Sequence, residues 1–466
     1  MLSFLLLPLY TGILATAGYG EVSIIFAWFA IFNVLLAYGM ETAFFRFYNG
    51  GDEKETVVST SLWSIGATTL LFFILGMFSL NFISEATGIE SRYIRFALFI
   101  LVLDALVIIP FAWLRANEKP MRYAIIKILN VAINFGLNLF FLLALPTIYS
   151  KNPEGFLAKL FMPDSEITYI FIAMVVASGI TFLLMLGLYV KSRLVFDFGL
   201  WQRMLAYAAP VLVAGLAFTI NEVFDRILLE HLLPENVAKS EVGQYSACYR
   251  LALFMTLFGT AFRLGIEPFF FSHSKSENPQ KAYAQITNYF VILGSIILLS
   301  VVVFADVLKI LFVHNELYWD AMSIVPIIVL ASFCLGIYHN LSVWYKITDQ
   351  TKFGAYISSI GALLTLVINL ALIPKLGYMA SALATLVAYS SMMAMSYYFG
   401  KKYYPIPYNM RKMVFYGGIS ILFSALSFYV FNRNLIAGSL LLLLFLGLIY
   451  KLEGDKLRTI FLRREN

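Results

Sequence analysis

The sequence predicts an all-α polytopic membrane protein. Of its 466 residues, 61% are hydrophobic, 17% are aromatic and only 13% are charged, with a mean hydropathy of +0.82. Apolar runs recur along the whole length, and each is long enough to cross a bilayer as a helix, which takes at least about 17 residues. An internal repeat relates the two halves. We therefore expect about fourteen transmembrane helices, built as two six-helix lobes plus two C-terminal helices.

The predicted spans follow one another with short connections. They are placed at residues 2–17, 22–45, 57–82, 92–114, 121–145, 167–190, 204–232, 243–271, 283–313, 321–345, 353–373, 378–400, 413–431 and 434–450. The first ten residues, MLSFLLLPLY, lack a basic segment and are interpreted as part of the first span, not as a signal peptide. Cys248 and Cys334 lie inside apolar runs, so neither a disulfide nor a metal site is expected from them.

The orientation follows from the Lys and Arg residues of alternate loops. One set of loops, together with the C-terminal tail, holds twenty-one of them and the other set holds eight. Because cytoplasmic loops carry the excess of positive charge, both termini are predicted to be cytoplasmic. This topology also accounts for most of the net charge of +6, which therefore gives no indication of a nucleic-acid partner.

The repeat is carried by two blocks. At a shift of 226 residues, GMETAFF at 39–45 matches GIEPFFF at 265–271. At a shift of 231, one polar stripe matches another: Lys127, Asn130, Asn134 and Asn138 fall on Ser358, Gly361, Thr365 and Asn369. Equivalent positions lie six spans apart, so both lobes sit the same way up, related by a pseudo-twofold axis along the membrane normal. The predicted parts are a lobe at 1–190, an amphipathic cytoplasmic linker at 191–203, a lobe at 204–400 and two extra helices with a basic tail at 401–466.

The span at 204–232 carries charges that lipid disfavours. Glu222, Asp225, Arg226 and Glu230 all lie in its second half. A charge at bilayer depth costs about 2.5 to 3.5 kcal/mol even on lenient scales, so such groups face a partner or a wet cavity. Thr219, Glu222, Arg226 and Glu230 share one helical face by their spacing. An ion pair between helices is one interpretation, and a charged, water-filled transport path is the favoured one.

Other polar groups within spans point to the same kind of cavity, expected between the lobes. Arg226, Arg250 and Arg263 could together hold a diphosphate, because the planar guanidinium suits phosphate oxygens. A second set, Lys127 with Asn130, Asn134 and Asn138, would suit phosphate or sugar hydroxyls. The alternatives are that the amides bond across a helix contact, and that Arg263 and Glu267, four residues apart, neutralise each other. Glu41, Asp104 and His339 also lie within spans.

Enzyme signals are missing from the sequence. It contains no G-x-x-x-x-G-K-[ST] phosphate loop and no H-E-x-x-H or paired-Cys metal spacing. No predicted extracytoplasmic loop is long enough to carry the catalytic groups of a membrane glycosyltransferase or polymerase. We therefore expect a transporter that is not an enzyme and that needs no cofactor.

Several blocks resemble the polysaccharide flippases of the multidrug/oligosaccharidyl-lipid/polysaccharide exporter superfamily. They are the stretch beginning GIYHNLSVWYKITDQ at Gly336, VGQYSACYRLALF from Val242, WLRANEKPMRYAIIKILNVAINFGLNLF from Trp113, and the Asp225–Arg226 pair. The resemblance covers essentially the whole chain. It implies ion-coupled alternating access that carries an undecaprenyl-diphosphate-linked oligosaccharide across a bacterial inner membrane. Many relatives carry an Arg near the end of span 1, where this chain has Gly12. Either the substrate is held differently here, or Arg46 and Lys127 serve in place of that Arg.

The expected roles follow from both lines of reasoning. The predicted diphosphate contacts are Arg226, Arg250, Arg263, Lys127 and Arg46. The predicted polar lining is Asn130, Asn134, Asn138 and Asn369, and the predicted ion-coupling residues are Asp225 and Glu222. The expected partners are a lipid-linked oligosaccharide (an O-antigen, capsule or exopolysaccharide unit), H⁺ or Na⁺ as coupling ion, membrane lipid and other polysaccharide-assembly proteins. The alternatives are a cation-coupled multidrug exporter, a membrane glycosyltransferase or polymerase, and an uncoupled scramblase-like or scaffolding role.

Overall fold

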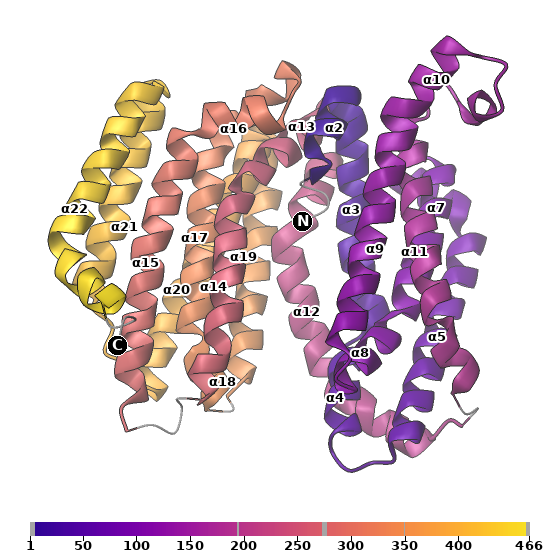
Figure 1. The fold of residues 1–466 in the computed structure, drawn as a ribbon, viewed down its shortest axis with the longest axis horizontal. Coiled ribbons are helices and arrows are strands. Elements are labelled where there is room, and N and C mark those ends of the chain that lie inside the picture. Colours follow the sequence, from indigo (N-terminus) through magenta and orange to yellow (C-terminus); the bar gives the residue numbers. More distant parts are fainter. Residues whose placement is uncertain (1–4, 193–194, 273–276, 349, 463–466) are drawn as a thin grey trace. The chain divides into compact units, whose positions relative to one another are not determined.

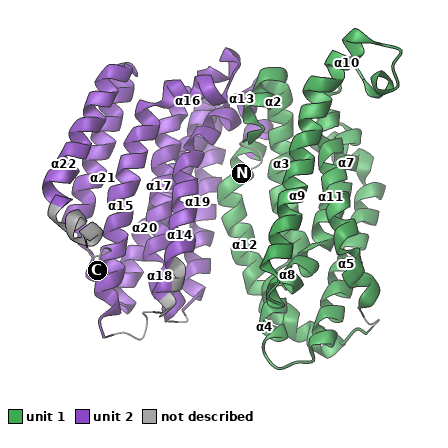
Figure 2. Ribbon diagram, in the orientation of Figure 1, with its two compact units in different colours: residues 1–227 green, residues 228–466 purple. Residues whose placement is uncertain are grey.

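The computed structural model describes residues 5–192, 195–272, 277–348 and 350–462, with only the backbone at 267–268, 271–272 and 455–462. Within these ranges the chain forms helices and no strand (Figure 1). Twelve of the described helical segments are long and apolar enough to cross a membrane. The prediction of an all-α polytopic membrane fold is confirmed. Two compact units divide the chain, residues 1–227 and 228–466 (Figure 2).

Unit 1 is a bundle of long helices. Its elements are α2 (Leu7–Ile13), α3 (Thr16–Ala37), α4 (Met40–Tyr48), α5 (Lys54–Phe78), α6 (Leu80–Thr87), α7 (Ser91–Leu106), α8 (Ile108–Ala116), α9 (Pro120–Leu139), η1 (Phe140–Ala144), α10 (Leu145–Lys151), η2 (Leu157–Leu160), α11 (Glu166–Lys191) and α12 (Phe198–Leu232). Helix α11 packs against both α7 and α9, and α7 also packs against α3 and α5. The polar residues of α7, α9 and α11 therefore meet inside one unit.

Gly39 explains how α12 joins this unit. The chain turns between α3 and α4 with φ of 31° at Tyr38 and 73° at Gly39, the left-handed region that favours glycine. A Cβ at Gly39 would lie 2.5 Å from the backbone oxygen of Ala208. The first half of α12 thus packs closely on α4, where Met204 and Ala208 share a core with Met40.

This packing places the first half of α12 in unit 1, because residues 204–227 belong to that unit by their contacts. The physical reason is the core just described, because the early part of α12 buries its apolar side chains against α4 and α5. The lobes that the repeat predicts, divided near residue 204, stay a prediction, as does their pseudo-twofold relation.

Unit 2 contains the remaining elements. They are α13 (Glu235–Tyr249), η3 (Arg250–Ala252), α14 (Leu253–Ser272), α15 (Pro279–Val303), α16 (Ala305–Phe312), η4 (Glu316–Ile324), α17 (Val325–Leu341), α18 (Val343–Ile347), α19 (Lys352–Leu376), α20 (Tyr378–Tyr403), α21 (Met410–Ala425), η5 (Leu426–Val430) and α22 (Leu435–Leu462). Helix α20 packs on α17 and α19, and α15 packs on α14, α17 and α21.

The two C-terminal helices are attached to unit 2 through α15. Leu299 of α15, Tyr416 of α21 and Phe445 of α22 share one buried core. The Tyr416 hydroxyl donates a 2.9 Å hydrogen bond to the Glu453 carboxylate, and Lys412 forms an ion pair with the same carboxylate. A buried carboxylate with two such partners ties α21 to α22.

Two predicted spans are not among the twelve long segments. The span at 2–17 corresponds in its described part to the short helix α2, followed by the first residues of α3. The span at 243–271 corresponds to α13, η3 and α14, where a 3₁₀ turn at Arg250–Ala252 interrupts the α-helix. Both regions are helical, so the observed pattern agrees with about fourteen segments.

Candidate functional site

The charged stripe of α12 contains a buried ion pair. Arg226 Nη1 donates to Asp225 Oδ1 at 2.7 Å and to the Glu222 backbone oxygen at 2.8 Å. The side chain of Asp225 is 2% exposed and that of Arg226 12% exposed. A charge held this far from solvent is stable only while it keeps its partner. The structure therefore brings together two residues for which the sequence predicted separate roles, phosphate binding by Arg226 and ion coupling by Asp225.

A polar cluster links α7, α9 and α11. Ser178 Oγ of α11 donates to Asp104 Oδ1 of α7 at 2.7 Å. Asn130 Nδ2 of α9 donates to Thr181 Oγ1 of α11 at 3.0 Å. Lys127, one turn before Asn130, has its Nζ 4.3 Å from the centre of the Phe111 ring. The cluster places a carboxylate and an ammonium group in the same helix packing region.

Asp104 was not among the predicted site residues. The signal that could have identified it was present, since a single carboxylate inside the apolar run VLDALV requires a partner. Ser178, 74 positions away, could not be recognised as that partner from spacing. The role of the cluster depends on the packing of α11 against α7 and α9.

The other two asparagines of the α9 stripe are buried in helix packing. Asn138 is 0% exposed; its Nδ2 donates to Asn134 Oδ1 at 2.7 Å, and its Oδ1 accepts from the Tyr10 hydroxyl at 2.9 Å. Asn369 of unit 2 is also 0% exposed, and its Oδ1 accepts from Ser381 Oγ at 2.8 Å. These bonds occur in helix contacts, which is one of the two interpretations that the sequence left open for the amides.

Arg46 lies at the end of α4, in unit 1. Its guanidinium carbon stands 4.3 Å from the centre of the Tyr207 ring, on α12. In the same region Arg115 forms an ion pair with Glu41, and its guanidinium lies over the Phe45 ring at 5.0 Å. Glu41 belongs to the repeat signature GMETAFF, and its partner is now identified. The side chain of its repeat equivalent, Glu267, lies outside the described residues.

One small recess in unit 2 is lined by three side chains that are, or can become, positively charged. They are Arg263 of α14, His339 of α17 and Lys346 of α18, with the Asn340 amide beside them. Arg250 lies in η3, at the start of α14, and does not line this recess. Thus Arg263 shares this recess with one other basic side chain, Lys346, and with the imidazole of His339.

Metal binding finds no support in the part of the chain that the structure describes. No group of three or more His, Cys, Asp or Glu side chains there could hold a metal ion. Cys248 and Cys334 are buried and free. Cys248 Sγ lies 3.3 Å from the Tyr318 backbone oxygen, and Cys334 Sγ lies 3.5 Å from Ser390 Oγ. Both cysteines are thus packed within unit 2.

Comparison with known proteins matches the chain to transporters. Residues 1–258 match the family model described as "Polysaccharide biosynthesis protein", and residues 210–371 match the model described as MatE. No curated protein matches the chain. These matches agree with the predicted class, a transport protein that is not an enzyme.

Solved structures share the fold. The lipid II flippase MurJ in an inward closed conformation is similar with a TM-score of 0.71 at 16% identity, covering 97% of this chain and 96% of that one. An inward-facing multidrug resistance MATE family transporter of the MOP superfamily has a TM-score of 0.65 at 14% identity, covering 86% and 93%. A mutant of the Vibrio cholerae MATE transporter VcmN has a TM-score of 0.56 at 14% identity, covering 87% and 94%.

Proposed function

The chain belongs to the polysaccharide biosynthesis protein family, and from that premise we propose that it is a flippase for a lipid-linked oligosaccharide. The substrate is an oligosaccharide on an undecaprenyl diphosphate carrier, moved by ion-coupled alternating access across a bacterial inner membrane with both termini cytoplasmic. The observation that carries the proposal is the Asp225–Arg226 pair, a guanidinium held by a carboxylate within a predicted transmembrane helix.

The pair supplies a way to couple an ion to the substrate. A diphosphate competes with Asp225 for Arg226, because charge-assisted bonds from a guanidinium suit phosphate as well as carboxylate oxygens. A proton or Na⁺ competes with Arg226 for Asp225. Either competitor opens the pair, so each favours binding of the other by reciprocal linkage. Simple antiport requires competition between ion and substrate, so this pair gives no support to antiport.

Additional positive groups support binding of a diphosphate. Lys127 and Arg46 in unit 1 stand over aromatic rings and make no ion pair among the residues described. In unit 2, Arg263 shares its recess with Lys346. We propose that these groups attract the phosphates, that Asn130 and Glu222 complete the polar path, and that Asn134, Asn138 and Asn369 act in helix packing.

A binding measurement tests the proposal. The purified protein is titrated with a short-chain lipid diphosphate oligosaccharide and, separately, with the cationic probe tetraphenylphosphonium. Arg226→Gln is expected to lower the affinity for the diphosphate ligand roughly tenfold to a hundredfold, which corresponds to the loss of one charge-assisted hydrogen bond. Arg203→Gln is the matched control, because Arg203 lies on the same helix, is exposed and pairs with Asp52. Equal diphosphate affinity in both variants would contradict the proposed role.

A cationic-drug exporter is the second candidate, favoured by the MatE match over residues 210–371. It relies on carboxylates within spans, of which the half-buried Asp104 and the buried Asp225 are examples. Tight binding of tetraphenylphosphonium that is lost in Asp104→Asn or Asp225→Asn, together with no diphosphate binding, would select this function over the flippase.

A further inference from the structure

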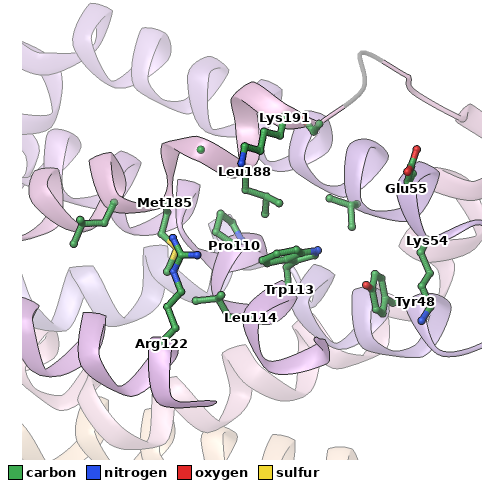
Figure 3. A pocket seen from close by; sticks show the side chains of 14 residues that line it. Tyr48, Lys54, Glu55, Pro110, Trp113, Leu114, Arg122, Met185, Leu188 and Lys191 are labelled. Atoms are coloured by element: carbon green, nitrogen blue, oxygen red, sulfur yellow. The ribbon is translucent and has the colours of Figure 1, made fainter. Parts of the chain in front are cut away.

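One end of unit 1 contains a recess that the proposed transport path does not use. It lies where α5 begins, α8 and α11 end and α9 begins, with a cavity volume of about 400 Å³. Figure 3 shows its side chains, with Arg122, Lys191 and Lys54 arriving from three different helices. This is the size range of small-molecule sites, about 300 to 1,000 Å³. The positive-inside rule predicts that this end faces the cytoplasm.

The rim of the recess is positively charged. Lys54 is the first residue of α5, Arg122 is near the start of α9, and Lys191 is the last residue of α11. Lys54 Nζ stands 5.0 Å from the centre of the Tyr48 ring. Among the described residues none of the three basic side chains forms an ion pair, and Glu55 is the one carboxylate in the lining. The rim can therefore attract an anion.

The floor of the recess is apolar and continues toward lipid. Leu114 and Met185 are buried at its base. On the same stretch of α11, Leu184 lines the recess and is exposed, and Leu183 and Val190 beside it are exposed too. Apolar side chains exposed on a helix that can span the membrane are suited to contact acyl chains. A ligand that fits this site has a negatively charged head and a hydrocarbon body.

Hydroxyl groups in the lining are already bonded. The Tyr48 hydroxyl donates to Asn117 Oδ1 at 3.1 Å, and Ser192 Oγ donates to the Tyr189 backbone oxygen at 2.9 Å. Trp113 adds an aromatic ring to the lining, a residue type that is enriched at membrane interfaces. The site thus offers cations and hydrocarbon but few free polar groups for sugar hydroxyls. This distinguishes it from a site for the oligosaccharide of the transported lipid.

We propose that this recess binds an anionic phospholipid from the leaflet at the predicted cytoplasmic face. Arg122 and Lys191 hold the phosphate, Lys54 adds long-range attraction, and one acyl chain follows Leu184 along α11. Basic pockets between transmembrane helices on the cytoplasmic side are suited to anionic head groups. The proposal rests on the predicted topology and stands apart from the identity of the transported substrate.

Lipid-dependent stability tests this assignment on the full-length protein in a neutral detergent. Phosphatidylglycerol, phosphatidylcholine and inorganic phosphate are titrated separately while the melting temperature is followed. Of these three ligands, only phosphatidylglycerol is expected to raise the melting temperature. In the double variant Arg122→Gln/Lys191→Gln, the apparent affinity for phosphatidylglycerol should fall about 30-fold. This factor corresponds to the loss of about 1 kcal/mol for each basic side chain near an anionic lipid. The control Lys401→Gln/Lys402→Gln removes two basic residues from the end of α20 and should bind as the wild type does.

A second variant blocks the recess without removing charge. Gly187 lines it, and a Cβ added there would meet no atom within 4 Å. The Cβ of Gly187→Leu therefore has room, and the rest of the leucine side chain is expected to occupy the space that the acyl chain needs, while Arg122 and Lys191 remain. It should melt at or above the wild-type temperature without lipid, because glycine disfavours helices, and should lose the response to phosphatidylglycerol.

Three results would overturn the proposal. The first is an unchanged response to phosphatidylglycerol in both the double variant and Gly187→Leu. The second is equal stabilisation by phosphatidylcholine, which would show that the rim charges play no part. The third is equal stabilisation by inorganic phosphate, which would identify a free anion as the ligand. Because none of these measurements involves transport, their failure is separable from failure of the flippase function.

Discussion

Asn138 of α9 and Asn369 of α19 make the same pair of bonds in the two units. Each side-chain amide donates to the backbone oxygen four residues earlier, at 2.8 Å, that of Asn134 in one case and Thr365 in the other. Each side-chain oxygen accepts a hydroxyl from another helix, Tyr10 or Ser381. The repeat therefore preserves a packing bond at a shift of 231 residues.

The first prediction concerns this bond. Asn138→Leu should lower the thermal stability of the purified protein and leave transport per folded molecule unchanged, because the side chain is fully buried. A double-mutant cycle with Tyr10→Phe should give a coupling free energy of about 0.6 and at most about 1.7 kcal/mol, as for hydrogen bonds between membrane helices. Loss of transport at full stability would restore the polar-lining role instead.

Gly39 gives a second prediction, with its repeat equivalent as control. Gly39→Ala should destabilise the protein by about 1 to 3 kcal/mol, since φ is 73° and the new Cβ would meet the Ala208 oxygen. Gly265→Ala should be neutral or stabilising by up to about 1 kcal/mol, because it lies within α14 with open space around it. Thermal unfolding of both variants checks this, and similar melting temperatures would contradict the contact between α4 and α12.

The buried ion pair gives a third prediction. Arg226→Gln and Asp225→Asn should each destabilise the protein, by up to about 3 to 5 kcal/mol, because each removes one partner of a buried ion pair. Combining them should cost less than the sum of the two single changes, because the pair is then removed as a whole. The readout is the melting temperature of the three variants beside the wild type. Additive destabilisation in the double variant would indicate that the two residues act independently.

Lys127 gives a fourth prediction. Lys127→Gln should reduce delivery of the lipid-linked substrate and leave the melting temperature nearly unchanged, because its Nζ contact is with the Phe111 ring. Lys119→Gln serves as control, because Lys119 stands over the Trp113 ring at 4.9 Å in a similar contact. The reverse pattern, with delivery lowered by Lys119→Gln alone, would remove Lys127 from the path.

Sequence patterns predicted the helical architecture because hydropathy is a local property. The runs that became α11, α19 and α20 were placed within a few residues of their observed bounds. The boundary between the compact units, after Ile227, is not evident from sequence patterns, because it depends on where α12 packs. The sequence of residues 204–208 does not indicate whether they contact α4 or another helix. Their contact with α4 is evident only from the core that they share with it.

The sequence predicted which types of residue form the candidate site better than it predicted their contacts. Charges at Asp225 and Arg226 were evident from the apolar context, yet their pairing is a matter of side-chain geometry. The bond from Tyr10 to Asn138 joins positions 128 residues apart, which no spacing rule reaches. The recess lined by Arg122 and Lys191 likewise arises only when the ends of α9 and α11 come together.

Outer-leaflet delivery in sealed vesicles tests the central claim most directly. Wild type, Arg203→Gln and the doubly neutralised Asp225→Asn/Arg226→Gln protein are reconstituted with an undecaprenyl-diphosphate oligosaccharide, and its exposure to an external glycosidase is measured with and without a proton or sodium gradient. We predict gradient-stimulated delivery by the wild type and Arg203→Gln, and none above empty vesicles by the double variant. Gradient-stimulated delivery by the double variant at the wild-type rate would contradict the account.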